Sequence, residues 1–151
     1  MTVAFSPVTV ADSIAEINIS GVTIKSLENI PQSGTLIMPV LFPQPNGFIS
    51  DIEVSRESFG GGTTAAMNFM YTLHYVFLFS ELGSGLSQLD PYSPLIEKLE
   101  TIWEKIAETD TVTGLVDMQL AGVETLGQVE DPSGNQYWGA LFSLRCLEYA
   151  Q

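Results

Sequence analysis

Residues 66–79 read AMNFMYTLHYVFLF, and this stretch decides the fold. Every second position from Met67 to Phe79 carries a bulky side chain, which is the two-residue period of a strand lying on a core. The intervening positions are mixed, because Asn68, Met70, Thr72 and His74 precede the apolar Val76 and Leu78. We therefore expect a long strand that is covered on one face and partly covered on the other.

The last element of the chain repeats this pattern. Residues 137–149 predict a central strand, because inward positions recur with a period of two: Trp138, Ala140, Phe142, Leu144 and Cys146. A turn signal at Asp131–Asn135 precedes this strand and connects it to the alternating run Thr113–Val129. In that run, Val116, Met118 and Leu120 are expected to share the inward face.

Shorter strands are expected in the N-terminal half. Val22–Ile30 predicts a strand near the sheet edge, and Pro39 confines Leu36–Phe42 to an edge or an irregular strand. A loop follows at residues 43–47. Ile52–Ser58 alternates apolar and polar residues, with Ile52 and Val54 on one side, as in a half-buried strand.

Two helices complete the pattern. Thr9–Asn18 is the first, with Thr9 and Asp12 as a capping pair. Pro94–Glu108 is the second, with Ser93 as its cap and a buried stripe of Leu95, Leu99, Ile102, Trp103 and Ile106. The order of elements predicts an α+β fold in one domain, residues 1–151, with a mostly antiparallel sheet and both helices on one face.

The composition indicates a subunit of a larger assembly. Only 15% of the 151 residues are charged, against about 25% in ordinary soluble domains. Eighteen acidic residues outweigh five basic ones and give a net charge of −13, which argues against binding to phosphates of nucleic acids or anionic membranes. We expect no signal peptide and no membrane-spanning helix, and the lone Cys146 suits a reducing cytoplasm.

Catalytic signals are weak. His74 is the only histidine and lies in mid-strand, where it is expected to be an ordinary sheet residue. The run Gly60–Thr64 lacks the lysine of a phosphate-binding loop, and Gly83–Ser84–Gly85 lacks the strand–turn–helix setting of a nucleophile. We therefore expect no catalytic residue, no cofactor and no metal.

An acidic ridge follows the second predicted helix, at Glu97, Glu100, Glu104 and Glu108. Its simplest interpretation is a solvated face, and the alternative is a charged surface held towards a partner or a pore. A carboxylate-bridged pair of metals would normally also recruit histidines, so the ridge does not predict one.

Several short segments, in this order and spacing, resemble the small tail terminator proteins (tail-completion or neck proteins) of long-tailed bacteriophages. The segments are Ser20–Gly21–Val22–Thr23–Ile24 with Leu27 and Ile30–Pro31, Leu41–Phe42–Pro43 with Pro45 and Gly47, Ser58–Phe59–Gly60, Tyr71–Thr72–Leu73 with Tyr75, Gly83–Ser84–Gly85, and Asp131–Pro132 with Gly134–Asn135. The resemblance covers nearly the whole chain. No one segment is specific by itself.

The resemblance implies a virion protein that is assembled in the host cytoplasm and lies at the neck, between head and tail. Such proteins form a hexameric ring that caps the tail tube, stops its polymerisation and presents a surface to the head. The implied partners are copies of the chain, the tail tube protein and a head-closure or connector protein, with sheath or other neck proteins as further candidates. DNA would pass through the ring without specific binding. The resemblance supplies no catalytic residues.

The segments expected to contact neighbours are the glycine-bearing loops, because long loops in compact domains are often functional. The candidate interface residues are Phe59, Gly60, Gly61, Gly62, Thr63, Gly83, Ser84, Gly85 and Tyr92. Two alternatives stay open. One is a head-closure or adaptor protein of the same neck, and the other is a small acidic enzyme or ligand-binding domain, which would need a convergent polar pocket.

Overall fold

A computed structural model of the chain describes residues 5, 7–30, 37–56, 67–81, 92–108, 111–112, 116–130 and 134–149. The long strand expected at residues 66–79 is β4 (Met67–Glu81), and the strand expected at the end of the chain is β7 (Gln136–Tyr149). The two strands pair antiparallel along most of their length, from Asn68↔Tyr149 to Glu81↔Tyr137. Both predictions are confirmed, and this pair is the centre of the sheet.

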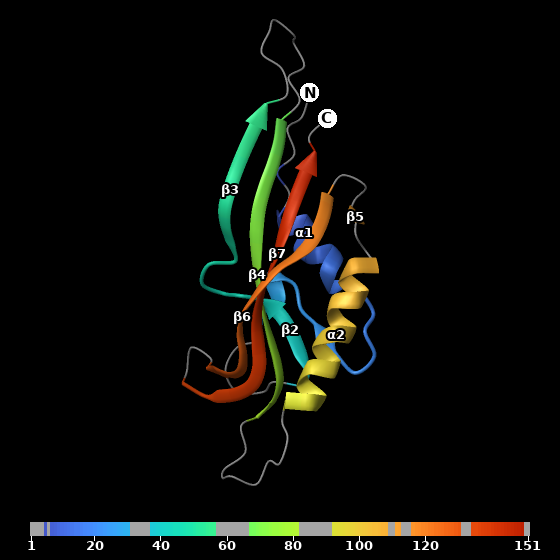
Figure 1. The fold of residues 1–151 in the computed structure, drawn as a ribbon, viewed down its shortest axis with the longest axis vertical. Helices are drawn as coiled ribbons and strands as arrows, with labels where there is room; N and C mark the ends of the chain where they lie inside the picture. Colours follow the sequence, from blue (N-terminus) through green and yellow to red (C-terminus); the bar gives the residue numbers. More distant parts are fainter. Residues whose placement is uncertain are drawn as a thin grey trace, which may run out of the picture.

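The other strands extend this central pair on both sides. β6 (Val116–Glu130) pairs with β7, and the short β5 (Thr111–Val112) pairs with the beginning of β6. On the other side of β4 lie β3 (Ile49–Arg56) and β2 (Val40–Pro43), and β1 (Thr23–Ile24) follows β2. Among the described strands only β1 and β2 pair in parallel, so the sheet is mostly antiparallel, as expected (Figure 1).

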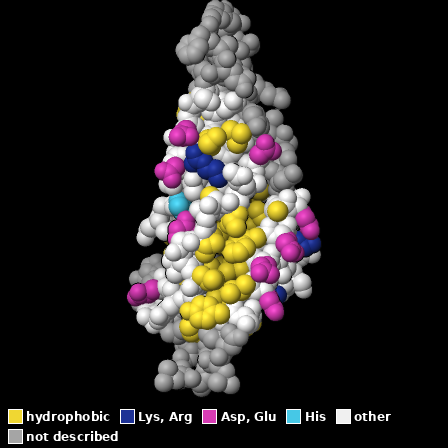
Figure 2. Space-filling model, viewed as in Figure 1, with side chains coloured by type: hydrophobic (Ala, Val, Ile, Leu, Met, Phe, Trp, Pro, Cys, Tyr) yellow, Lys and Arg dark blue, Asp and Glu magenta, His cyan; other side chains and the backbone are white. Residues whose placement is uncertain are grey.

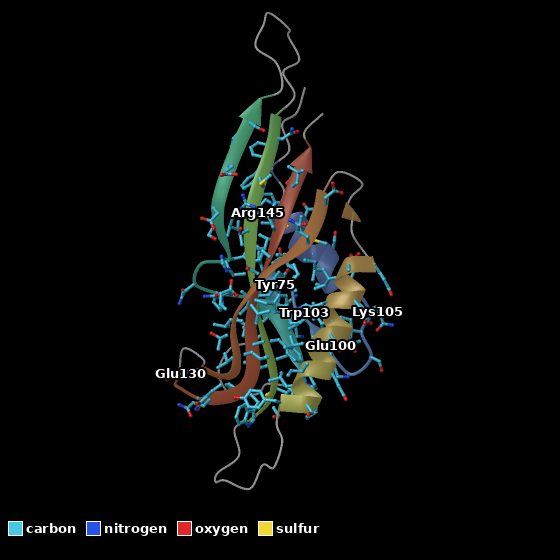
Figure 3. The ribbon with its side chains drawn as sticks, viewed as in Figure 1. Tyr75, Glu100, Trp103, Lys105, Glu130 and Arg145 are labelled. Atoms are coloured by element: carbon cyan, nitrogen blue, oxygen red, sulfur yellow. The ribbon has the colours of Figure 1, made fainter. Side chains whose placement is uncertain are left out.

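The main core lies between one face of the sheet and the two helices, α1 (Pro7–Ala15) and α2 (Tyr92–Glu108). The inward face of β4 contributes Tyr71, Leu73, Tyr75 and Phe77, all almost completely buried. The helices contribute one stripe each: Val10, Ala11 and Ile14 from α1, and Leu95, Leu99, Ile102 and Ile106 from α2. Trp103 is partly buried and packs against Phe142, and it lies near Tyr75 between α2 and the sheet (Figure 3).

A second, smaller apolar cluster lies on the other face of the sheet. Val76 and Leu78, the late apolar residues of the mixed face of β4, are buried there. They pack with residues from β2, β6 and β7: Val40, Phe42, Val129 and Tyr137. The prediction that this face of β4 is only partly covered is therefore confirmed.

The N-terminal segments differ from expectation. The first helix begins at Pro7, so Thr9 lies inside it and cannot cap it; a proline suits the first turn, where its missing N–H has no partner. Val22–Ile30 is not one strand, since only Thr23–Ile24 pairs and a short 3₁₀ helix, η1 (Leu27–Asn29), follows. β2 is not an edge strand, because it lies between β1 and β4. Pro39 lies just before it, and the Pro39 carbonyl oxygen accepts a hydrogen bond from the Thr23 N–H (3.0 Å).

Two further expectations are corrected. β3 lies where a strand was expected, but Ile52 and Val54, expected on its buried side, are 52% and 53% exposed. A bulge between Ser50 and Glu53, with Asp51 in the left-handed region (φ 52°), turns this part of the strand away from the core. α2 begins at Tyr92, so Ser93 is already inside the helix and not its cap.

Candidate assembly interface

Most of the candidate interface residues predicted from the sequence lie outside the described residues. These are Phe59, Gly60, Gly61, Gly62, Thr63, Gly83, Ser84 and Gly85. Tyr92 is described, and it is the first residue of α2 with an exposed side chain. Among the described residues, the candidate interface therefore consists of Tyr92 and the surface around it.

Tyr92 packs onto the sheet near the C-terminal end of β6. Its ring meets Trp138 edge-on, with 5.5 Å between the ring centroids. Its hydroxyl oxygen lies over Gly127, where an added Cβ would be only 3.0 Å away. Gly127 also has φ +130°, a conformation that other residues rarely adopt. A glycine is therefore needed at position 127, because a larger residue would crowd the Tyr92 ring where it packs against β6.

Three apolar side chains of β6 continue the surface that begins at Tyr92. Leu120, Val123 and Leu126 pair with Leu144, Phe142 and Ala140 of β7, whose side chains all point into the main core. Because paired residues share a face of the sheet, the three β6 residues point to the side that carries the helices. α2 covers them incompletely, and each is at least 40% exposed.

We call this surface the β6–α2 strip: Tyr92 and Ile96 from α2, with Leu120, Val123 and Leu126 from β6. The five residues are between 36% and 45% exposed. Figure 2 shows a continuous apolar band running obliquely over this region, with Asp and Glu side chains along its border. A contiguous apolar patch with a polar rim is typical of a protein–protein contact site.

The sequence pattern missed this strip for an identifiable reason. Strict alternation predicts Leu120 as an inward core residue and would place Val123 and Leu126 on opposite faces. β6 instead carries two irregularities, between Leu120 and Gly122 and between Val123 and Thr125. Each inserts one extra residue, so apolar residues three apart share one face. The repeated spacing of three is the signal that could have revealed it.

The backbone of β6 is also open beside the strip. β7 pairs with one edge of β6, whereas β5 covers the other edge only at Val116 and Asp117. Within the part of the chain that the structure describes, no strand pairs with that edge from Met118 to Glu130. Unpaired N–H and C=O groups along a strand edge are a template for pairing with another chain. The strip and the open edge therefore form one surface.

The acidic ridge lies on the solvent side of α2. Glu97, Glu100, Glu104 and Glu108 are exposed, and Glu108 contacts Lys105 at 3.4 Å. Glu100 and Lys105 lie on the helix away from the sheet (Figure 3). The interpretation as a solvated face agrees with this exposure. The ridge is next to the β6–α2 strip but not part of it.

A polar row crosses the sheet on the face opposite the helices. The Ser50 Oγ and His74 Nε2 atoms are 2.6 Å apart, and His74 Nδ1 lies 3.7 Å from Glu124 Oε1. No local sequence pattern indicates this row, because its members come from β3, β4 and β6. The 3.7 Å separation is too long for a direct hydrogen bond, although the order of hydroxyl, imidazole and carboxylate is the one used in nucleophilic catalysis.

Arg145 forms a second polar group on the same face. Its Nη1 donates hydrogen bonds to the Asp51 carbonyl oxygen (2.9 Å) and to Thr72 Oγ1 (2.8 Å). Its Nη2 pairs with Glu53 Oε2 at 3.2 Å. Arg145 therefore holds the bulge of β3 against β4 and β7, at the position labelled in Figure 3.

A buried hydrogen bond lies inside the main core. The Tyr71 hydroxyl donates a hydrogen bond to Glu148 Oε2 (2.9 Å), and both residues are almost completely buried. Burial, and then the nearby Glu148, raises the pKa of the Cys146 thiol to about 12. Burial is also the main cause that raises the pKa of the Tyr71 phenol far above its usual range. Cys146 is thus a core residue, as expected.

Comparisons with known proteins add no identification. The scan against protein-family models finds no family that matches the chain, and no curated protein matches it. Among the described residues, no helix has the length and apolar character needed to cross a membrane, and no group of three or more His, Cys, Asp or Glu side chains is placed to hold a metal ion.

Proposed function

We propose that this chain is a structural subunit of a phage neck, a tail terminator that forms a hexameric ring, caps the tail tube and joins it to the head. The observation that carries the proposal is the β6–α2 strip beside the open edge of β6. A surface that offers both apolar side chains and unpaired backbone groups fits a permanent contact with another protein chain.

The composition supports a second copy as the partner at this surface. A chain with 15% charged residues has little charge with which to solvate its exterior. A ring removes one such surface from water on every subunit, because each copy makes the same head-to-tail contact with the next. The net charge of −13 then lies on the surfaces that stay wet, where it would repel passing DNA rather than bind it.

The proposal is tested by polymerising the tail tube protein of the same virus with and without this chain. Tubes should stop growing when the chain is added, and the chain should lie at tube ends in electron micrographs. The Leu126→Asp variant, altered only within the strip, should leave elongation unchecked. Unchanged elongation with the wild-type chain, and no chain at tube ends, would exclude a terminator.

A second candidate function rests on the row Ser50–His74–Glu124. The order of hydroxyl, imidazole and carboxylate in this row is the one that a small enzyme would need. Ser50 would then be the nucleophile, and His74 would accept the serine proton. A fluorophosphonate probe, which labels nucleophilic serines, distinguishes such an enzyme from a structural subunit. Labelling of the wild-type chain that disappears in both Ser50→Ala and His74→Gln would favour the enzyme, whereas an unlabelled chain would remove it.

A further inference from the structure

We infer that the neighbouring copy covers the β6–α2 strip with its β3, so that β3 of one subunit pairs with β6 of the next and the sheet continues around the ring. The inference rests on the proposed ring and names the contact that builds it. Three independent features of the described strands support it: an open edge on each side of the sheet, a compatible strand direction, and apolar side chains on the same face.

The first feature is the second open edge. β3 pairs with β4 on one side, and no other described strand pairs with its outer side. β3 and β6 lie on opposite sides of the central β4–β7 pair in the same sheet; in Figure 1, β3 is at the upper left and β6 crosses from the upper right to the lower left. Two open edges on opposite sides of one subunit allow the same contact to be repeated from copy to copy.

The second feature is strand direction. β3 and β7 are both antiparallel to β4, and β6 is antiparallel to β7. β6 therefore runs parallel to β4 and antiparallel to β3. A neighbour placed beside β6 in the same orientation presents its β3 antiparallel to β6. Antiparallel pairs form direct, perpendicular hydrogen bonds, so neither subunit has to invert for the sheet to continue.

The third feature is the face on which the apolar side chains lie. Val54 of β3 pairs with Phe69, whose side chain belongs to the main core on the helix side of the sheet. Leu120, Val123 and Leu126 lie on that same side. In a continued sheet, the exposed Val54 of one copy would meet the exposed β6 residues of the next as cross-strand neighbours. Apolar contacts and backbone hydrogen bonds would then form together.

Pairing of β6 with a second β6 is the competing arrangement, and charge disfavours it. β6 carries Asp117, Glu124 and Glu130 and no basic residue. Antiparallel self-pairing would bring these carboxylates towards one another, which destabilises a strand pair. In β3, Glu53 is already paired with Arg145 at 3.2 Å. Self-pairing would also close at a dimer and leave β3 uncovered.

Cysteine cross-linking tests the inference directly. Val54→Cys is combined in one chain with Leu120→Cys, Val123→Cys or Leu126→Cys, and the assembled protein is treated with a short bifunctional maleimide. The native Cys146 is completely buried and its pKa is about 12, so it gives no background. At least one double variant should yield a ladder of covalent oligomers that extends beyond the dimer, and the matched pair Val54→Cys with Ile37→Cys should not.

The outcomes separate the contact from the ring. If the protein forms particles of ring size but none of the three double variants yields a ladder, the continued sheet is wrong and the proposed function still stands. Covalent dimers from Leu120→Cys, Val123→Cys or Leu126→Cys alone would overturn it in favour of β6 pairing with β6. A chain that stays monomeric even with the tail tube protein would contradict the proposed function, and this inference with it.

Discussion

Replacing Leu126 with aspartate should prevent assembly while leaving the subunit folded. Leu126 is 40% exposed in the single subunit. Complete burial of a leucine is worth about 1.5–3 kcal/mol relative to full exposure. Covering the exposed part in a subunit contact therefore contributes about 0.6–1.2 kcal/mol per contact, and Leu126→Ala should weaken assembly by about that amount.

The aspartate variant goes further, because its carboxylate would be forced into a contact lined by the other apolar residues of the strip. Desolvation of an unpaired carboxylate costs several kcal/mol. The contact should weaken by at least about 3 kcal/mol, which is more than a hundredfold in the association constant. The folded subunit loses only the burial of the covered part of Leu126, about 1–2 kcal/mol.

Sedimentation velocity over a range of protein concentrations measures the assembly, and thermal unfolding followed by circular dichroism measures the subunit. Ile37→Asp is the control, because Ile37 is 80% exposed and lies outside the strip. This control should assemble like the wild type. A Leu126→Asp protein that is folded and sediments as the wild-type particle would refute the role of the strip.

Three further predictions concern the subunit itself. Gly139→Ala should lower the free energy of unfolding by about 3 kcal/mol or more in chemical denaturation, because an added Cβ would overlap the carbonyl oxygen of Phe77. The matched change Gly122→Ala, with nothing within 4 Å of the added Cβ, should alter stability little; equal losses would contradict the close approach of β7 to β4. Tyr71→Phe should destabilise by about 1–3 kcal/mol, because the Glu148 carboxyl group loses a buried donor, while Tyr92→Phe serves as the exposed control. Stability should fall as the pH rises above about 9, because the unfolded chain releases the Cys146 proton near the ordinary value of 9.0 while the folded chain keeps it up to about 12. Tyr71 adds to this loss above about 10, and each group contributes up to about 1.4 kcal/mol per pH unit. Stability that is flat from pH 8 to 11 would contradict the burial of these groups.

The sequence predicted the elements whose pattern repeats over many residues. β4 and β7 could be predicted because a period of two persists through both strands, and α2 because its apolar stripe is regular. The α+β class and the placement of both helices on one face followed from the order of these elements. Errors arose where a strand is short or irregular, as in Val22–Ile30, where only two residues pair and a 3₁₀ helix follows.

The candidate interface was harder to predict, for a physical reason. Tyr92 was expected at the interface because it borders a glycine-bearing loop, and the structure places it at one end of an exposed apolar strip. The rest of the strip depends on two bulges in β6, which strict alternation does not anticipate and which only the spacing of three between its apolar residues indicates. The row Ser50–His74–Glu124 forms because strand register brings three distant segments together. Ser50 and Glu124 lie 24 and 50 positions from His74 in the sequence, so no local pattern indicates the row.

The mass of the assembled particle distinguishes a ring subunit from a solitary protein. Native mass spectrometry would be recorded for the wild-type chain alone and with a phage tail tube protein, the partner in the proposed function. A ring-forming subunit should give one closed species of six copies of the 16.4 kDa chain in at least one of these samples. A 16.4 kDa monomer in both samples would contradict it.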